Sequence, residues 1–265
     1  MSERTSYAPG TPCWVDLATP DVEAAERFYG PLFGWEIPEL PNSAEMGGYR
    51  RAKKDGRDVA GVYPLMEEGQ PPVWATYVSV ADAAATAALI EGNGGSTIVA
   101  PMDIGMGHMA VFADPAGAVF GLWQPNTFAG AELVNDYGCF SWNELGTRDT
   151  AGARDFYPAV FGWGAEEESS ERTGTYTVWT LDGAMVAGMI DIGVLELPPE
   201  VPPHWLVYFG VEDADAAAAT ASSGGGEVRM GPIDIPVGRF AVLADPFGAV
   251  FAVMQPSAET LAEMP

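Results

Sequence analysis

Apolar and aromatic residues recur in nearly the same pattern in the two halves of the chain. The stretch FYGPLFGW begins at Phe28, and FYPAVFGW begins at Phe156. In front of them lie two alternating stretches, CWVDLAT from Cys13 and SWNELGT from Ser141. Alternation predicts a half-buried strand, and apolar residues at helical spacing that stop at a glycine predict a helix. Each half is therefore expected to begin with a strand followed by a helix.

The similarity extends over nearly the whole chain. PPVWATYVSV from Pro71 matches PPHWLVYFGV from Pro202. Further on, ADPAGAVFGLWQP from Ala113 matches ADPFGAVFAVMQP from Ala244. A repeat of this extent is typical of duplicated domains, each large enough for a core of its own. The sequence therefore predicts two homologous domains.

Each half contains two copies of a smaller unit. After the first helix, three strands are predicted, GWEIPEL from Gly34, GGYRRAKK from Gly47 and DVAGVYPL from Asp58. A further strand, an Ala-rich helix and three more strands follow. The fold class is therefore predicted as α+β, with four βαβββ modules in two tandem domains, residues 10–126 and 138–258, joined by a linker at residues 127–137.

Composition and charge narrow the possible partners and the location. Hydrophobic residues make up 48% of the chain and charged residues 18%, which is typical of a globular protein. The net charge of −25 would repel phosphate backbones, so we expect no nucleic-acid partner. The apolar runs are too short to span a membrane, and the first twelve residues do not have the apolar core of a secretory signal, so we expect neither a membrane partner nor secretion. Two cysteines at unmatched places in the repeat predict no disulfide framework, so the cytoplasm is the expected location.

One short segment is basic in this acidic chain. RRAKKDGRD, residues 50–58, holds five of the twelve cationic residues. The Asp-Gly pair is typical of a hairpin turn, and the second half has no comparable cluster. We expect the solvated tip of a hairpin here rather than an anion site.

The repeated motifs resemble the vicinal-oxygen-chelate superfamily, the group of glyoxalase I, extradiol dioxygenases and bleomycin-resistance proteins. A helix that ends in FY and is followed by LFGW or VFGW carries the resemblance, together with the turns ADPAGAVFGL and ADPFGAVFAV. The resemblance covers residues 11 to 257 and is greatest to tandem-domain members called hydroxylase or glyoxalase-like. It implies that paired modules curl into cups, with a ligand or metal on the concave face. It does not fix the chemistry, because one fold hosts many functions.

The resemblance also implies where metal ligands would lie. Metal-using members place His, Gln or Glu on the first strand of each module and Glu near the end of its last strand. The matching positions here carry no metal-binding side chain; they are Trp14, Ala75, Gly121, Trp142, Leu206 and Ala252. We therefore expect no cofactor, with a divalent metal held by some other set of residues left as an alternative.

Alternation along the strands predicts what lines the two concave faces instead. Asp16 shares a face with Trp14, and Glu144 shares one with Trp142. Aromatic walls, small residues and a carboxylate are typical of a pocket for an organic ligand. The predicted lining comprises Trp14, Asp16, Ala75, Tyr77, Gly121, Trp123, Trp142, Glu144, His204, Leu206, Tyr208, Ala252 and Met254.

Each of these residues also has a structural interpretation. Trp14 and Trp142 could fill the core of a closed cup. Asp16 and Glu144 would be costly to bury without partners, and with raised pKa values they could act as general acid or base. At an open sheet edge they would have no special role.

Two classes of function fit this reading. The first is a metal-free protein of glyoxalase or bleomycin-resistance type that binds a small aromatic or cationic organic molecule. The alternative is a glyoxalase-like lyase or a dioxygenase or hydroxylase acting on a small carbonyl or aromatic substrate. It would use an irregular metal set or metal-free acid–base chemistry through Asp16, Glu144 and His204.

Other questions stay open at this point. Either one cup or both could be functional, and a purely structural first half would leave Glu144 and His204 as the active pair. The sequence does not determine which modules pair to form each cup. Because the duplication already supplies a pseudo-twofold arrangement, we expect a monomer.

Overall fold

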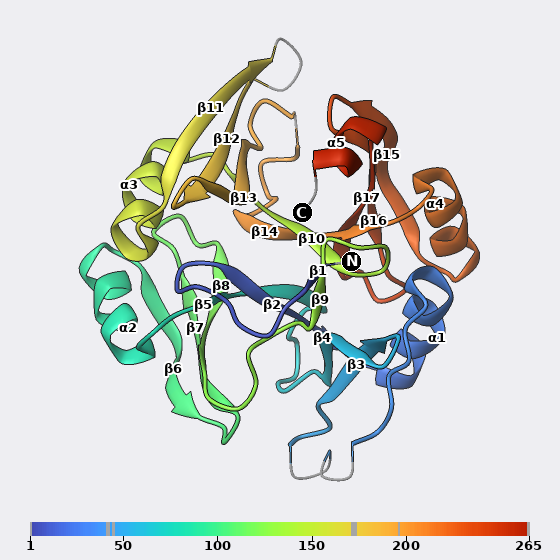
Figure 1. Cartoon of the computed structure of the whole chain (residues 1–265), viewed down its shortest axis with the longest axis horizontal. Helices are drawn as coiled ribbons and strands as arrows, with labels where there is room; N and C mark the ends of the chain where they lie inside the picture. The colour runs from blue at the N-terminus through green and yellow to red at the C-terminus, as the bar shows by residue number, and fades with distance from the viewer. Residues whose placement is uncertain (1, 41–42, 44–45, 171–173, 196, 264–265) are drawn as a thin grey trace.

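Two mixed β-sheets with helices along their outer sides make up the fold (Figure 1). The computed structural model of the chain describes all residues except 1, 41–42, 44–45, 171–173, 196 and 264–265. Sheets of seven and eight strands correspond to the first and second halves, which confirms the predicted α+β class. Among the described residues, no helix has the length and apolar character needed to cross a membrane.

The first half forms one sheet, with strands in the order β3-β4-β2-β5-β8-β7-β6. Its elements are β1 (Ser2–Glu3), β2 (Pro12–Thr19), α1 (Val22–Phe33), β3 (Arg50–Lys54), β4 (Arg57–Pro64), β5 (Val73–Ser79), α2 (Ala83–Gly92), β6 (Ser96–Asp103), β7 (Gly107–Ala113) and β8 (Val119–Pro125). The two-residue strand β1 lies outside this sheet and pairs with β9 (Leu133–Val134), between the halves.

The second half repeats this order with one more strand, as β11-β12-β13-β10-β14-β17-β16-β15. Its elements are β10 (Phe140–Thr147), α3 (Thr150–Phe161), β11 (Gly164–Ser170), β12 (Gly174–Leu181), β13 (Ala184–Asp191), β14 (His204–Gly210), α4 (Ala214–Ser223), β15 (Glu227–Ile235), β16 (Gly238–Ala244), β17 (Val250–Pro256) and α5 (Ala258–Glu263).

The two modules of each half pair with each other to form one sheet. β2 lies antiparallel to β5 in the first half, and β10 lies antiparallel to β14 in the second. Each of these pairs joins the opening strands of the two modules of one half. Each cup is therefore built from a single half, and residues of the two cups do not come from the same sheet.

One predicted strand of the first half is missing. GWEIPEL was expected to form a strand, but among its residues only Glu36 pairs, through an isolated bridge to Lys53. Pro38 explains the difference, because proline has no N–H to donate and restricts the residue before it. The matching stretch of the second half lacks proline and forms the edge strand β11, which pairs with β12.

The basic segment forms the predicted hairpin between β3 and β4. Asp55 and Gly56 occupy its tip with φ angles of 50° and 77°, the left-handed conformation that an Asp-Gly turn requires. Arg51 and Lys53 both contact the buried carboxylate of Asp58. The cations nearest the sheet thus have an internal partner, so the cluster is not a free anion site.

The helices pair across the two halves rather than within them. α1 packs against α4, and α2 packs against α3, as the two sides of Figure 1 show. Phe28 and Tyr29 of α1 share one core with Phe251 of β17. The repeated aromatic motif at the end of each first helix therefore lies at the contact between the halves.

Two buried tyrosines connect the halves by reciprocal hydrogen bonds. The Tyr29 hydroxyl accepts a hydrogen bond from Trp74 Nε1 at 3.0 Å and donates one to Asp245 of the other half at 3.1 Å. In the second half, the Tyr157 hydroxyl accepts from Trp205 Nε1 at 3.1 Å and donates to Asp114 at 2.9 Å. The tyrosine of each repeated FY motif therefore bonds to the aspartate of the ADP motif in the other half, so the contact occurs twice.

The tryptophans of the FGW motifs reach across in the same way. Trp35 Nε1 donates a hydrogen bond of 2.6 Å to the carbonyl of Gly138, which lies just before β10. Trp163 Nε1 donates one of 2.7 Å to the carbonyl of Gly10, just before β2. Each motif thus fixes the start of the strand that carries the other half's candidate site residues.

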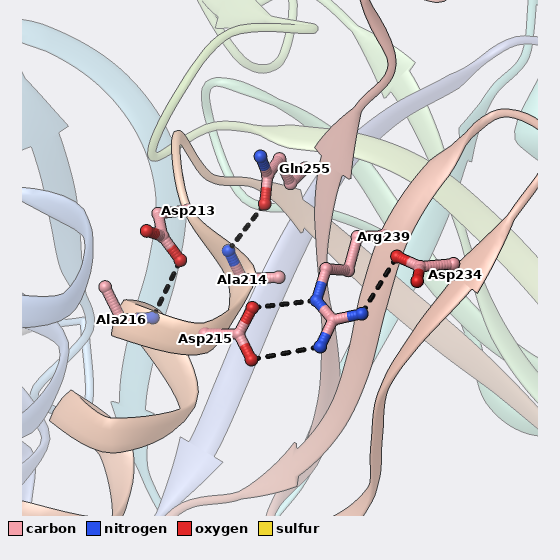
Figure 2. A network of polar contacts seen from close by, with 7 residues as sticks. All are labelled: Asp213, Ala214, Asp215, Ala216, Asp234, Arg239 and Gln255. Atoms are coloured by element: carbon pink, nitrogen blue, oxygen red, sulfur yellow. Dashed lines mark hydrogen bonds and ion pairs between the residues drawn. The ribbon is translucent and has the colours of Figure 1, made fainter.

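Polar contacts tie α4 to its own sheet near the outer edge. Figure 2 shows Arg239 of β16 bonding both carboxylate oxygens of Asp215, at 2.7 and 3.0 Å, and Asp234 of β15 at 2.8 Å. The Gln255 side chain accepts a hydrogen bond from the backbone N–H of Ala214 at the start of the same helix. Because the arginine and its two partners are substantially exposed, these contacts position the helix more than they stabilise the fold.

We expect Tyr29→Phe to destabilise the fold. The substitution leaves the Trp74 donor and an Asp245 oxygen without their buried partner, and such a loss costs about 1–3 kcal/mol. Urea denaturation should show a lower midpoint with an unchanged slope. Tyr137→Phe, at an exposed tyrosine, is the matched control. An unchanged midpoint for Tyr29→Phe would show that the contact between the halves adds nothing to stability.

Candidate functional site

Trp14 and Asp16 lie on the inner face of the first sheet, as alternation predicts. In the strand register, Trp14 faces Tyr77 of β5, and Asp16 faces Ala75. Trp14 Nε1 donates a hydrogen bond of 2.8 Å to the Tyr49 hydroxyl. We call the surface around these side chains the first cup.

Two glycines of the first cup have no empty space above them, contrary to what we expected for Gly121 from the sequence. A Cβ atom placed on Gly121 would lie 2.1 Å from the Tyr77 ring. One placed on Gly61 would lie 2.0 Å from the Tyr49 hydroxyl and 2.7 Å from the Asp16 Cβ. The two tyrosine side chains therefore pack directly over glycines, and the volume is already occupied.

An aromatic ring from beyond the sheet closes this cup. Phe128, three residues after β8, meets Trp14 edge-on, with ring centroids 4.9 Å apart, and Trp123 in a similar way at 5.9 Å. Trp123 Nε1 also donates a hydrogen bond of 2.9 Å to the Phe128 carbonyl. Trp14 and Trp123 are only 4% and 6% exposed, so in the first half they pack as core side chains.

Asp16 is a buried carboxyl group within this packed face. Its side chain is buried, and its Oδ1 atom has no hydrogen-bond partner. Burial raises the pKa of Asp16 to about 7, and a hydrogen bond from Tyr77 partly opposes that shift. Such a group is uncharged for much of the pH range in which an ordinary aspartate is ionised.

The same arrangement recurs in the second sheet, around Trp142 and Glu144. Trp142 Nε1 donates a hydrogen bond of 2.9 Å to the Tyr176 hydroxyl, and the Tyr208 hydroxyl donates one of 2.9 Å to Glu144 Oε1. Tyr176 lies over Gly188, where a Cβ atom would meet its hydroxyl at 1.9 Å. We call this surface the second cup.

Glu144 is held by two tyrosine hydroxyls. Its burial raises its pKa, while hydrogen bonds with Tyr176 and Tyr208 favour the carboxylate and oppose the rise. The pKa of each tyrosine is raised well above its ordinary value by burial and by the neighbouring charge of Glu144. The tyrosines therefore remain protonated donors at neutral pH, and Glu144 is the carboxyl group that they surround.

The second cup is open where the first is closed. A cleft of about 1810 Å³ covers it and continues to the N-terminal segment at Tyr7 and the start of β5 at Val73. Exposed apolar side chains, including Met185 and Val237, stand along this cleft. Its inner wall includes Trp142, Glu144, Tyr176, Leu206, Tyr208, Phe240 and Met254.

The remaining predicted residues of the second half also lie at the second cup. Ala252 faces Tyr208 in the register and packs in a small apolar cluster with Leu206. His204 also lines the cleft, and one of its ring nitrogens lies 2.9 Å from the Pro202 carbonyl. In the register His204 faces Gly146, two residues along the strand from Glu144.

The irregular metal set considered from the sequence is not assembled. Asp16 belongs to one sheet, whereas Glu144 and His204 belong to the other. Within the part of the chain that the structure describes, no group of three or more His, Cys, Asp or Glu side chains could hold a metal ion. Together with the apolar residues at the usual ligand positions, this donor set does not fit the divalent metal of metal-using relatives.

The sequence reading missed Tyr49, Tyr176 and Phe128. The sequence did contain a pattern that pairs the two tyrosines. Each lies two residues after a glycine, and each is followed further along the chain by a VAG stretch that occurs in both halves. The glycines of those VAG stretches, Gly61 and Gly188, are the ones over which the tyrosines pack. Phe128 has no such signal, because it lies where the repeat has ended.

We expect the free energy of unfolding to depend on pH through Asp16. The folded pKa of about 7 exceeds the ordinary 3.8, so the folded state binds the proton more tightly and this group's contribution falls as pH rises from about 4 to about 7. Asp16→Asn should remove the fall and become relatively more stable above pH 7, by up to roughly 4 kcal/mol.

Urea denaturation of both proteins over a pH series measures this difference. Asp55→Asn, at the exposed tip of the hairpin, is the control with an ordinary environment. A difference between Asp16→Asn and the unsubstituted protein that stays constant with pH would contradict a raised pKa at Asp16.

Two curated relatives match nearly the full chain. The putative glyoxylase CFP32 of Mycobacterium tuberculosis is 43% identical over 262 residues, covering 97% of this chain and 99% of the relative. The anthracycline biosynthesis protein DnrV of Streptomyces peucetius is 40% identical over 266 residues, covering 95% of each.

Solved structures show the same fold at low sequence identity. An Mn(II)-bound glyoxalase from Novosphingobium aromaticivorans has a TM-score of 0.64 at 16% identity, covering 93% of this chain and 82% of that one. The 2,2',3-trihydroxybiphenyl 1,2-dioxygenase of Sphingomonas wittichii has a TM-score of 0.64 at 15% identity, covering 94% and 91%.

The family assignment rests on both halves of the chain. The sequence matches the family pattern twice, over residues 13–122 and over residues 140–253. These two segments contain most of each sheet and the tyrosine and aspartate residues that join the two halves. The chain thus belongs to the Glyoxalase/Bleomycin resistance protein/Dioxygenase superfamily, as its repeated motifs indicated.

Proposed function

We propose that this protein binds a planar aromatic organic molecule, without a metal, in the cup of its second half. The observation that carries the proposal is the placement of Glu144, whose carboxylate is held by two tyrosines at the base of a large apolar cleft. A carboxylate in such a place fixes the orientation of a ligand that is otherwise held by apolar contact.

The walls of the cleft suit a flat ring system. Trp142, Phe240 and Met254 offer indole, phenyl and thioether surfaces, all of which pack well on aromatic faces. Pockets for drug-sized ligands usually measure about 300–1,000 Å³. A cleft of about 1810 Å³ has room for a ligand of several fused rings.

Glu144 also suits a ligand with a positive charge or a hydrogen-bond donor. One of its oxygens, Oε1, already accepts a hydrogen bond from Tyr208. A cationic group in the cup would favour the charged carboxylate and lower the pKa of Glu144, so binding of the cation and loss of the proton are coupled.

The relatives support a polycyclic ligand. DnrV is named for anthracycline biosynthesis, and it aligns with 95% of this chain. Anthracyclines are flat, fused-ring aromatic compounds, some of them bearing an amino sugar, which is the ligand chemistry that the cleft and Glu144 favour. The first cup, with its rings packed together, serves the fold in this proposal.

We expect Trp142→Ala to weaken binding of an anthracycline about tenfold or more, because the indole forms one wall of the cup. Trp14→Ala, the matched substitution in the closed cup, should change the affinity less than about twofold. Isothermal titration calorimetry measures both affinities. Equal weakening by both substitutions, or by neither, would contradict the assignment of the site to the second cup.

The metal-free part of the proposal has its own control. Dialysis against a chelator should leave the affinity unchanged, and loss of binding that added manganese or iron restores would contradict it. Binding is measured directly here, so the result does not depend on any reaction.

A second candidate is an enzyme that uses Glu144 for acid–base chemistry on a carbonyl substrate. The placement of Glu144 beside two tyrosines that stay protonated favours this candidate, since burial raises the pKa of its carboxyl group above the ordinary value, the direction in which enzymes shift a catalytic glutamate. The tyrosine hydroxyls would then position the carboxyl group or stabilise negative charge on an oxygen of the substrate. The name of CFP32, a putative glyoxylase, agrees with a carbonyl substrate.

We expect Glu144→Gln to separate the two candidates. For an enzyme, the substitution removes the exchangeable proton, so turnover of a carbonyl substrate should fall by about 10²–10⁴-fold with little change in binding. For a binding protein, no turnover exists to lose, and Glu144→Gln should weaken a cationic ligand more than its neutral analogue. Steady-state turnover and calorimetry on the same variant give both readouts.

A further inference from the structure

The ring of Phe128 sits in the first cup in the way a bound aromatic molecule would. Its contacts with the Trp14 and Trp123 indoles are edge-to-face, with interplanar angles of 90° and 74°. The guanidinium of Arg51 lies 5.4 Å from the centre of the ring, within the range of a cation–π contact. Aromatic walls and a cation over a ring face are the elements of a site for a single aromatic ring.

The backbone holds this ring independently of the ring's own contacts. The N–H groups of residues 126, 127 and 128 all donate to the Met106 carbonyl, at 3.0–3.3 Å. Beyond Phe128, the N–H of Ala131 donates to the Cys13 carbonyl at 2.9 Å, and the Tyr7 hydroxyl donates to the Ala131 carbonyl at 2.6 Å. The segment is therefore fixed on both sides of Phe128, and removal of the ring alone should leave its course unchanged.

In the second half, the position that matches Phe128 carries no aromatic ring. Phe128 lies three residues after Pro125, the end of β8, and the residue three after Pro256, the end of β17, is Glu259. Glu259 is exposed on α5, and Pro256 and Thr260 line the open cleft. The two cups share Trp, Tyr and carboxylate positions, but differ in the segment that follows their last strand.

We propose that Phe128 is a built-in occupant of a second aromatic-ring site. This site, in the first cup, is bounded by Trp14, Trp123 and Arg51, and its natural ligand class is a single aromatic ring of the size of phenol. In this chain the ring of Phe128 fills the site, whereas the second cup opens to the cleft. The inference concerns the first cup and stands apart from the function proposed for the second.

The test is to remove the ring and offer a free one. Phe128→Ala should create a cavity with apolar walls, and such cavities bind small aromatic molecules. Phenol is the probe, and a ligand that binds only the folded state raises the Tm. We expect saturating phenol to raise the Tm of Phe128→Ala by several degrees more than that of the unsubstituted protein, and calorimetry to show one additional site per chain.

Two controls locate the additional site. Phe128→Leu retains most of the volume of the ring, so it should show no additional phenol-dependent rise. Adding Trp142→Ala to Phe128→Ala should preserve the rise, because that substitution alters only the second cup. Should Phe128→Ala fail to fold by circular dichroism, Phe128→Cys, which also removes the ring and leaves a cavity of nearly the same size, takes its place in every measurement.

Two results would overturn the proposal. A folded variant without the ring that gains no phenol-dependent rise would show that the first cup collapses and contains no ring site. A rise that disappears with Trp142→Ala would place the phenol in the second cup instead. Neither result bears on the affinity of the second cup for its own ligand, which the calorimetry with Trp142→Ala alone measures.

Discussion

The fold depends on a buried hydrogen bond that can be satisfied only by the other half. Tyr29 and Tyr157 each lie in the core, where a hydroxyl without a partner is costly, and each finds its acceptor on the last turn of the opposite sheet, at Asp245 and Asp114. The Oδ1 atom of each aspartate also accepts hydrogen bonds from backbone N–H groups of its own turn. One aspartate in each half therefore serves both the turn before the final strand and the contact between the halves.

The tyrosine–aspartate bonds hold the two sheets together, but they do not involve the residues of the cups, which differ. Trp14 and Trp142 occupy equivalent strands, and both bond a tyrosine that packs over a glycine. The two cups differ in what covers them. The ring of Phe128 covers the first cup, whereas the second cup faces a cleft of about 1810 Å³. The two carboxylates consequently have different surroundings: Asp16 is buried and has an oxygen without a partner, whereas Glu144 is partly exposed, with two tyrosine donors and access to the cleft.

Local patterns in the sequence predicted the fold class, the family and the inward faces of the first strands. Alternation was sufficient for Trp14 and Asp16, because a strand has only two faces and one of them is buried by the helices. Contacts between distant segments were not predictable in this way. The pairing of modules within each half, the ring of Phe128 and the packing of Tyr77 over Gly121 all depend on residues that only the folded chain brings together. The loss of the strand at Pro38 had a local cause that the alternating pattern concealed. The boundaries of the domains, the cytoplasmic location and the monomeric state remain predictions.

The reciprocal contacts also bear on why the two halves share one chain. Two separate copies of a single half could make the same pair of tyrosine–aspartate bonds, each copy supplying one of each residue, as a symmetric dimer does. In such a dimer, any residue that entered one cup would enter the other as well, so both sites would be blocked or both would be open. Joining the halves covalently removes that equivalence. A substitution such as the phenylalanine at position 128 then alters one site only, and a symmetric scaffold can acquire a single, unshared binding site without any change to the interface that holds it together.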